Sequence, residues 1–99
     1  MKKIKDVLHI RRFDYKLIKR TDKTALYELS VRNIIYGYEI HKIRLFPVSD
    51  KIIHKKGERM AFTNEFGKYA WSYQDLNLAL TKFEEVDLWN MIIYQKHYS

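Results

Sequence analysis

Residues 12–45 read RFDYKLIKRTDKTALYELSVRNIIYGYEIHKIRL, and apolar side chains recur at every second position over most of this run. A period of two is typical of β-strands with one buried face, because successive side chains point to opposite sides of a sheet. Three strands are predicted, separated by turns at residues 21–24 and at Arg32-Asn33. The expected core-facing residues of the three strands are Phe13, Tyr15 and Leu17, then Tyr27, Leu29 and Val31, then Tyr38 and Ile40.

The segments that follow the third strand are less regular. After His41 the apolar positions shift by one, to Ile43 and Leu45, which predicts a bulge or a strand end buried on both faces. Residues 46–50 then end the sheet. Residues 51–63 fit either a basic loop or a loose hairpin, and the loop is the preferred interpretation.

A helix is predicted in the C-terminal third of the chain, where the apolar spacing changes to three and four residues. The apolar face of this helix consists of Leu76, Ala79, Leu80 and Phe83. Residues 69–71 lead into it as a short extended segment, and Ser72 with Asp75 fits a capping box at its start. Residues 86–94 either extend the helix or form a last strand, and the helix is preferred.

Together these elements predict one α+β domain over residues 1–99, an antiparallel meander of three or four strands packed by a C-terminal helix. A chain of this length accommodates a single core. The apolar face of all three strands is expected beneath the helical part, and the opposite face is expected to be polar. Trp71 and Trp89 are expected in the core, because burial of a large aromatic side chain stabilises a small domain.

The residue types present exclude several kinds of active site. The chain has no cysteine, so thiol catalysis and zinc–thiolate sites are absent. Its four histidines lack metal-ligand spacing, its three glycines stand singly, and no serine lies in a nucleophile elbow. Glu84, Glu85 and Asp87 are interpreted as a solvated helix face. The sequence therefore predicts a protein without catalytic activity, cofactor or metal.

Positive charge is concentrated at the N-terminal end of the chain. Nineteen Lys and Arg against twelve Asp and Glu give a net charge of +7, and residues 1–23 alone hold nine Lys and Arg against three Asp. Residues 60–99 hold three Lys against five Asp and Glu. This polarity is typical of a domain that meets a polyanion with one side. The alternative is a solvated surface that keeps the protein soluble.

Seven cations are the candidate phosphate contacts of a nucleic-acid-binding protein: Arg12, Lys16, Arg20, Arg32, Lys55, Lys56 and Arg59. The first four are expected on the solvent-facing side of the sheet, and the last three on the loop that follows it. Carboxylates such as Asp14 and Glu28 are expected on the same side, so the cations could instead pair across strands. Base stacking would also require exposed aromatic side chains, for which Tyr36, Tyr73 and Trp71 are the candidates.

Two stretches of the chain resemble small uncharacterised proteins carried by bacterial prophages and other mobile elements. They are residues 37–44, GYEIHKIR, and residues 66–73, FGKYAWSY, which run into the predicted helix. The resemblance covers about half of the chain and carries no established activity or site residues. It implies an accessory role, in which the protein binds host or phage macromolecules without catalysis.

These observations favour a small non-catalytic protein-interaction module, of accessory or inhibitory type, over the nucleic-acid-binding alternative. High tyrosine content and open strand edges suit recognition of a protein partner. An uncovered edge strand could also pair with a second copy, which makes a homodimer a further candidate. No window has the apolar length of a membrane span, and the basic start lacks the apolar stretch of a secretion signal. A cytoplasmic location without membrane partners is expected.

Overall fold

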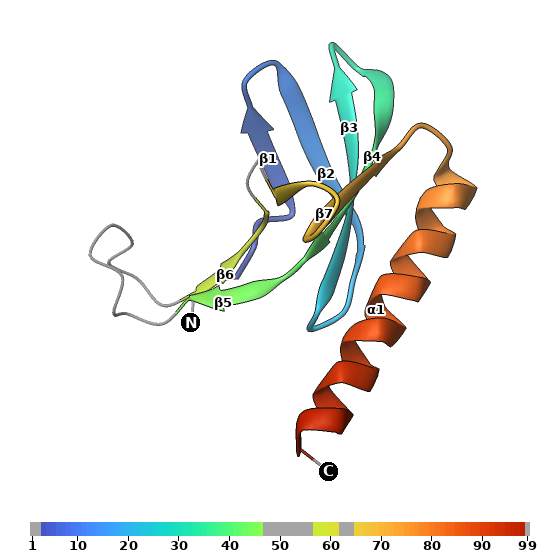
Figure 1. Cartoon of the computed structure of the whole chain (residues 1–99). Helices are drawn as coiled ribbons and strands as arrows, with labels where there is room; N and C mark the ends of the chain where they lie inside the picture. The colour runs from blue at the N-terminus through green and yellow to red at the C-terminus, as the bar shows by residue number, and fades with distance from the viewer. Residues whose placement is uncertain (1–2, 47–56, 62–64, 99) are drawn as a thin grey trace.

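The computed structural model of the chain describes residues 3–46, 57–61 and 65–98 (Figure 1). Five strands form an antiparallel sheet in the order β1-β2-β3-β4-β7. These strands are β1 (Val7–Ile10), β2 (Phe13–Arg20), β3 (Thr24–Val31), β4 (Ile34–Lys42) and β7 (Ala70–Tyr73). The helix α1 (Leu76–Tyr98) follows β7 and packs across one face of the sheet. The predicted α+β class is confirmed, with a sheet slightly larger than expected.

A second, two-stranded sheet continues from the end of β4. It pairs β5 (Arg44–Phe46) with β6 (Gly57–Arg59) in antiparallel register. The preference for a loop over residues 51–63 is therefore wrong at Gly57–Arg59, where a strand forms. Residues 47–56, which include Lys55 and Lys56, lie outside the described residues.

Two tight hairpins meet at one end of the large sheet. The predicted turn at Arg32-Asn33 is confirmed, because the β3–β4 ladder ends in the pair Val31 and Ile34. Arg32 and Asn33 have φ of 51° and 67°, the left-handed geometry of a two-residue hairpin whose twist matches its strands. In the β1–β2 turn, Arg11 also has a positive φ, of 58°. Non-glycine residues adopt this conformation rarely, so both turns are held by the strands that flank them.

The sheet buries apolar side chains on both faces, which corrects the prediction of one apolar face beneath the helix. The helix-side cluster consists of Leu26, Tyr38, Ile40, Ala79, Phe83 and Val86. The far-side cluster consists of Ala25, Tyr27, Leu29 and Ile43, flanked by Ile4, Leu8, Phe13, Tyr15, Leu17 and Met60. The predicted face is thus divided: its β2 and β3 residues lie on the far side, and its β4 residues Tyr38 and Ile40 lie under α1.

Strand register explains this division. Residues that face each other across an antiparallel pair point to the same side of the sheet. Ile40 lies opposite Leu26 and Tyr38 lies opposite Glu28, so the apolar positions of β4 match the even-numbered positions of β3. Irregularities between Leu29 and Ser30 and between Leu17 and Lys19 shift the alternation further. The alternation of apolar residues within one strand does not reveal its register against the next strand, so it could not predict which face each strand buries.

The helix begins one residue after Asp75, whose carboxylate caps it. The amide of Asn77 donates to Asp75 Oδ1 at 2.7 Å. The predicted capping box is wrong in its first residue, because Ser72 belongs to β7. The preference for helix over residues 86–94 is confirmed. Within the described residues, no helix combines the length and the apolar content that crossing a membrane requires.

Helix α1 is attached to the sheet by apolar contacts and by one partly buried carboxylate, that of Asp87. Thr24 is fully buried, and its hydroxyl donates to Asp87 Oδ1 at 2.8 Å, as the Thr21 hydroxyl does at 2.5 Å. Asp87 is therefore an anchor rather than part of a solvated face. Glu84 and Glu85 are exposed, as predicted, and pair with Lys19 and Lys82.

The two tryptophans differ in their surroundings. Trp71 is partly buried and packs against the helix-side cluster. Trp89 is 56% exposed, so its expected place in the core is wrong. It lies on α1 beyond Val86, the last helix residue of the helix-side cluster. Figure 1 shows α1 continuing past the end of the sheet, where no strand of the described chain covers it.

Candidate functional site

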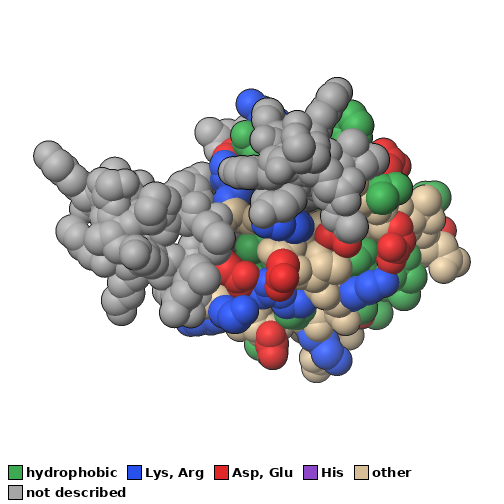
Figure 2. All heavy atoms as spheres, turned by 90° about the horizontal axis from the view of Figure 1, so that it is seen from below, with side chains coloured by type: hydrophobic (Ala, Val, Ile, Leu, Met, Phe, Trp, Pro, Cys, Tyr) green, Lys and Arg blue, Asp and Glu red, His purple; other side chains and the backbone are tan. Residues whose placement is uncertain are grey.

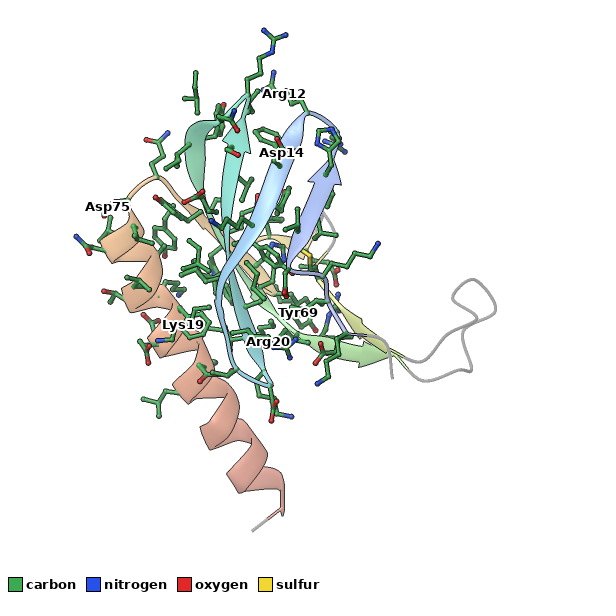
Figure 3. All side chains as sticks on the ribbon, turned by 180° about the vertical axis from the view of Figure 1, so that it is seen from behind. Arg12, Asp14, Lys19, Arg20, Tyr69 and Asp75 are labelled. Carbon is green, nitrogen blue, oxygen red and sulfur yellow. The ribbon has the colours of Figure 1, made fainter. Side chains whose placement is uncertain are left out.

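The cations predicted from the sequence do not share one side of the sheet. Arg12 lies at the β1–β2 turn and Arg20 at the opposite end of β2 (Figure 3). The irregularity after Leu17 reverses the alternation, so Arg20 opposes Ala25 on the far side of the sheet. Lys16 opposes Glu28, an arrangement that favours pairing of opposite charges across the strands.

The remaining candidates are Arg32, Arg59, Lys55 and Lys56. Arg32 lies in the β3–β4 turn, and Arg59 lies in β6 opposite Arg44. Lys55 and Lys56 fall outside the described residues. Seen from below, at the end of the sheet opposite the two hairpin turns, the visible Lys and Arg side chains lie among Asp and Glu (Figure 2). Of the seven, the structure brings Arg12 and Arg32 to the same end of the sheet.

Arg20 forms a two-pronged ion pair that ties the large sheet to β6. Its Nη1 and Nη2 donate to the two carboxylate oxygens of Glu58, each at 2.7 Å. The Glu58 side chain is 7% exposed and also accepts the Ile4 amide at 3.1 Å. The hydrogen bonds from Arg20 hold the pKa of Glu58 below its ordinary value. Arg20 is thus occupied by a structural contact.

The free energy of unfolding is expected to depend on pH through this pair. The Glu58 pKa is lower in the folded state than in the unfolded state, so its contribution is full above the ordinary pKa of 4.5 and is lost as the pH falls. We expect Glu58→Gln to lower the unfolding free energy by about 2 kcal/mol at neutral pH, less than for a fully buried pair. The unfolding free energies of the two proteins, measured by urea titration, should converge as the pH falls below 4.5. A difference that stays constant with pH would contradict this assignment.

The end of the sheet that carries the two turns is both apolar and basic. Four large apolar side chains there are exposed, Ile10 by 43%, Ile34 by 72%, Ile35 by 55% and Tyr36 by 58%. The turn residues between these strands are Arg11, Arg12, Arg32 and Asn33, all of them exposed. Asp14 opposes Ser30 in the β2–β3 ladder, so the same register continued places Arg12 near Arg32. We refer to these eight residues as the hairpin tip.

Aromatic contacts hold the hairpin tip in place. The rings of Phe13 and Tyr36 meet edge to face with centroids 5.2 Å apart. The guanidinium of Arg12 lies 5.3 Å from the Phe13 ring centroid. Beside Tyr36 a shallow cleft of about 250 Å³ runs along β4 to Tyr73. The exposed isoleucines are therefore presented on a braced hairpin.

A buried polar network lies beneath the far side of the sheet. The Ala61 amide donates to His41 Nδ1 at 3.2 Å, so the ring proton is on Nε2, which donates to Glu39 Oε1 at 2.9 Å. The Tyr15 hydroxyl donates to Glu39 Oε2 at 3.3 Å. Burial, together with the Glu39 carboxylate, raises the pKa of Tyr15 above its ordinary value. Because both nitrogens of His41 are engaged, this group supports the fold and does not offer a free base.

In comparisons with known proteins, no protein-family model, curated protein or solved structure matches the chain. The strongest candidate site therefore stands on geometry alone. Sequence reasoning found two of the tip's arginines and the exposed Tyr36 but missed Ile34 and Ile35. The only signal for them was the pair of adjacent isoleucines directly after the turn, where the alternation breaks.

Proposed function

We propose that this protein is a non-catalytic protein-interaction module, of accessory or inhibitory type, that docks on a larger protein through the hairpin tip. The observation that carries this proposal is the exposure of Ile34, Ile35 and Tyr36 beside three arginine-bearing turn positions. Isolated exposed apolar residues are ordinary, whereas a cluster of them rimmed by polar groups marks an interaction surface. The accessory role agrees with the resemblance to prophage proteins.

The residue types of the tip suit a protein interface. Tyrosine and arginine are the residues most often found at the energetic centres of such interfaces, and aliphatic side chains fill the pockets around them. Three arginines without a carboxylate among the eight tip residues fit an acidic patch on the partner. The net charge of +7 would speed the encounter with such a patch.

The nucleic-acid alternative has weaker support. A protein that follows a phosphate backbone needs cations along one continuous surface. Of the four candidates expected on one face, Arg20 is engaged by Glu58 and Lys16 opposes Glu28. Arg12 and Arg32 remain, and they stand among exposed isoleucines, which favour a protein surface over phosphates.

A second copy of the chain is a weaker candidate partner than a different protein. The outer edge of β1 is open within the described chain, and Val7 on it is exposed. The Leu17 amide donates to the Asp6 carbonyl, so by alternation Val7 and His9 turn their main-chain groups outward. A strand of four residues offers few such groups, too few for a stable dimer without a larger apolar contact.

Affinity capture with matched variants tests this proposal. The chain, immobilised by its C-terminus, should retain a stoichiometric protein from a lysate of the organism that encodes it. Ile34→Asp combined with Ile35→Asp should abolish that retention, and Leu78→Asp, which alters an exposed leucine of α1, should preserve it. Retention that is equal for all three proteins would refute the docking face. Loss of retention after nuclease treatment would instead assign the chain to nucleic acid.

A further inference from the structure

A groove lies between the start of β7 and helix α1, at the opposite end of β4 from the hairpin tip. It has a volume of about 570 Å³ and is lined by Lys42, Lys68 and Trp71 on the sheet side. Lys82, Val86 and Trp89 line it on the helix side. A volume of this order accommodates several side chains of a ligand. The groove therefore combines an apolar lining with cationic walls.

The charge of this groove favours an anionic ligand. Three lysines line it against a single carboxylate, that of Glu85, which pairs with Lys82 at 3.3 Å and is itself exposed. The ammonium groups lie against aromatic rings: Lys82 Nζ is 4.9 Å from the Trp71 centroid, and Lys42 Nζ is 5.8 Å from it. Cation–π contact holds these long side chains in position before a ligand arrives.

The strand that borders the groove has a free main-chain position at Ser72 on its outer edge. The amide of Lys42 donates to the Tyr69 carbonyl, and Trp71 lies opposite Ile40 in the same ladder. Main-chain groups of alternate residues face the neighbouring strand, so those of Ser72 point away from β4. On that side of β7, Phe66 and Gly67 already engage Ala70, whose carbonyl accepts the Gly67 amide at 2.7 Å, and no strand of the described chain pairs with Ser72. An extended peptide that lies along β7 could accept and donate hydrogen bonds there.

The geometry favours a peptide over a nucleic acid at this groove. Bases of a single strand stack on open aromatic faces. Here cations lie over those faces, on Trp71 as described and on Tyr69, where Lys68 Nζ is 5.3 Å from the ring centroid. At Ser72 the strand offers a main-chain N–H donor and a C=O acceptor. A peptide backbone carries both complementary groups, whereas a sugar–phosphate backbone carries no amide donor.

We propose that the groove between β7 and α1 is a second binding site, which takes an extended acidic peptide segment of a protein partner. The peptide adds beside β7 as a further strand, its carboxylates meet Lys42 and Lys82, and an apolar side chain packs between Trp71 and Trp89. This site does not depend on the hairpin tip, because the two lie at opposite ends of β4.

Selection from a phage-displayed library of random decapeptides, with the full chain as bait, tests the proposal. The selected peptides should be rich in Asp and Glu next to an aromatic or aliphatic residue. Lys42→Glu combined with Lys82→Glu should select Lys- and Arg-rich peptides instead and should bind the wild-type peptides about tenfold more weakly or worse. Lys5→Glu combined with Lys16→Glu makes the same change in net charge away from the groove and should leave binding unchanged. Circular dichroism checks that each variant is folded, and Lys82→Gln provides a milder change should the double variant unfold.

Amide exchange measured by nuclear magnetic resonance tests the mode of binding. With a selected peptide bound, exchange of the Ser72 amide should slow and the Trp71 indole signal should shift. Several results would overturn the proposal: no enriched peptides, equal binding by the charge-reversed variant, or a Ser72 amide that is unaffected. Tight binding of fluorescein-labelled oligothymidylate that is lost in the charge-reversed variant would assign the groove to nucleic acid. The Ile34→Asp and Ile35→Asp double variant should retain peptide binding, so failure at the tip and failure at the groove are distinguishable.

Discussion

Replacing Phe83 with alanine is expected to lower the free energy of unfolding by about 4 kcal/mol. Phe83 is 1% exposed and belongs to the helix-side cluster, where it packs with Leu26 and Ile40 of the sheet. Its removal leaves a cavity between two rigid layers, neither of which can collapse into the space without losing its own contacts. Small domains are stable by roughly 5–15 kcal/mol, so the loss is a large part of the total.

Urea denaturation followed by circular dichroism measures this effect. Leu88→Ala is the matched control, because Leu88 lies on the same helix with more than half of its side chain exposed. We expect that control to change the unfolding free energy by less than about 0.5 kcal/mol. A change below about 1 kcal/mol for Phe83→Ala would mean that the helix does not cover the sheet as described.

Aspartate at both Ile34 and Ile35 is expected to weaken binding of the captured partner by about 100-fold or more. Both side chains are more than half exposed in the free protein, so the substitution removes little from its core. In a complex they would become buried, and two carboxylates at the centre of an interface lack partners to replace their lost water. An acidic patch on the partner would add repulsion to that cost. Calorimetric titration with the purified partner measures the change.

A gentler pair of substitutions separates binding from folding. Ile34→Thr with Ile35→Thr keeps the branched side chains that suit a strand and removes only part of the apolar surface. It should weaken binding by about tenfold and leave the thermal midpoint within a few degrees of the wild type. Unchanged affinity for both pairs, with folded proteins, would show that the tip is not the docking face.

The fold class was predictable because period-two and helical patterns are strong and separated along the chain. The α+β class, the turn at Arg32-Asn33 and the long helix all follow from local spacing. The strand β1 was missed, because Val7–Ile10 includes His9 and lies in a basic stretch. Which face each strand buries could not be derived, since that depends on register shifts at positions such as Leu29 and Ser30.

The candidate sites were less predictable than the fold. Sequence alternation placed Arg20 with Lys16 on an outer face, whereas the irregularity after Leu17 turns Arg20 toward Glu58, which is distant in sequence. Charge counts describe how many cations a chain has but not which carboxylates they meet. The residues of the hairpin tip and of the β7–α1 groove come from segments that the tertiary fold brings together. The spacing of residues within one segment therefore does not predict either site.

The central claim, that the hairpin tip meets a protein partner, is tested most directly by photo-crosslinking. Benzoylphenylalanine placed at Tyr36 should form a covalent adduct of defined mass with one protein in the organism that encodes the chain. The same photoreactive residue at Leu78, exposed on helix α1, should not form this adduct. Failure of Tyr36 to crosslink any protein, or identical adducts from both positions, would contradict the account.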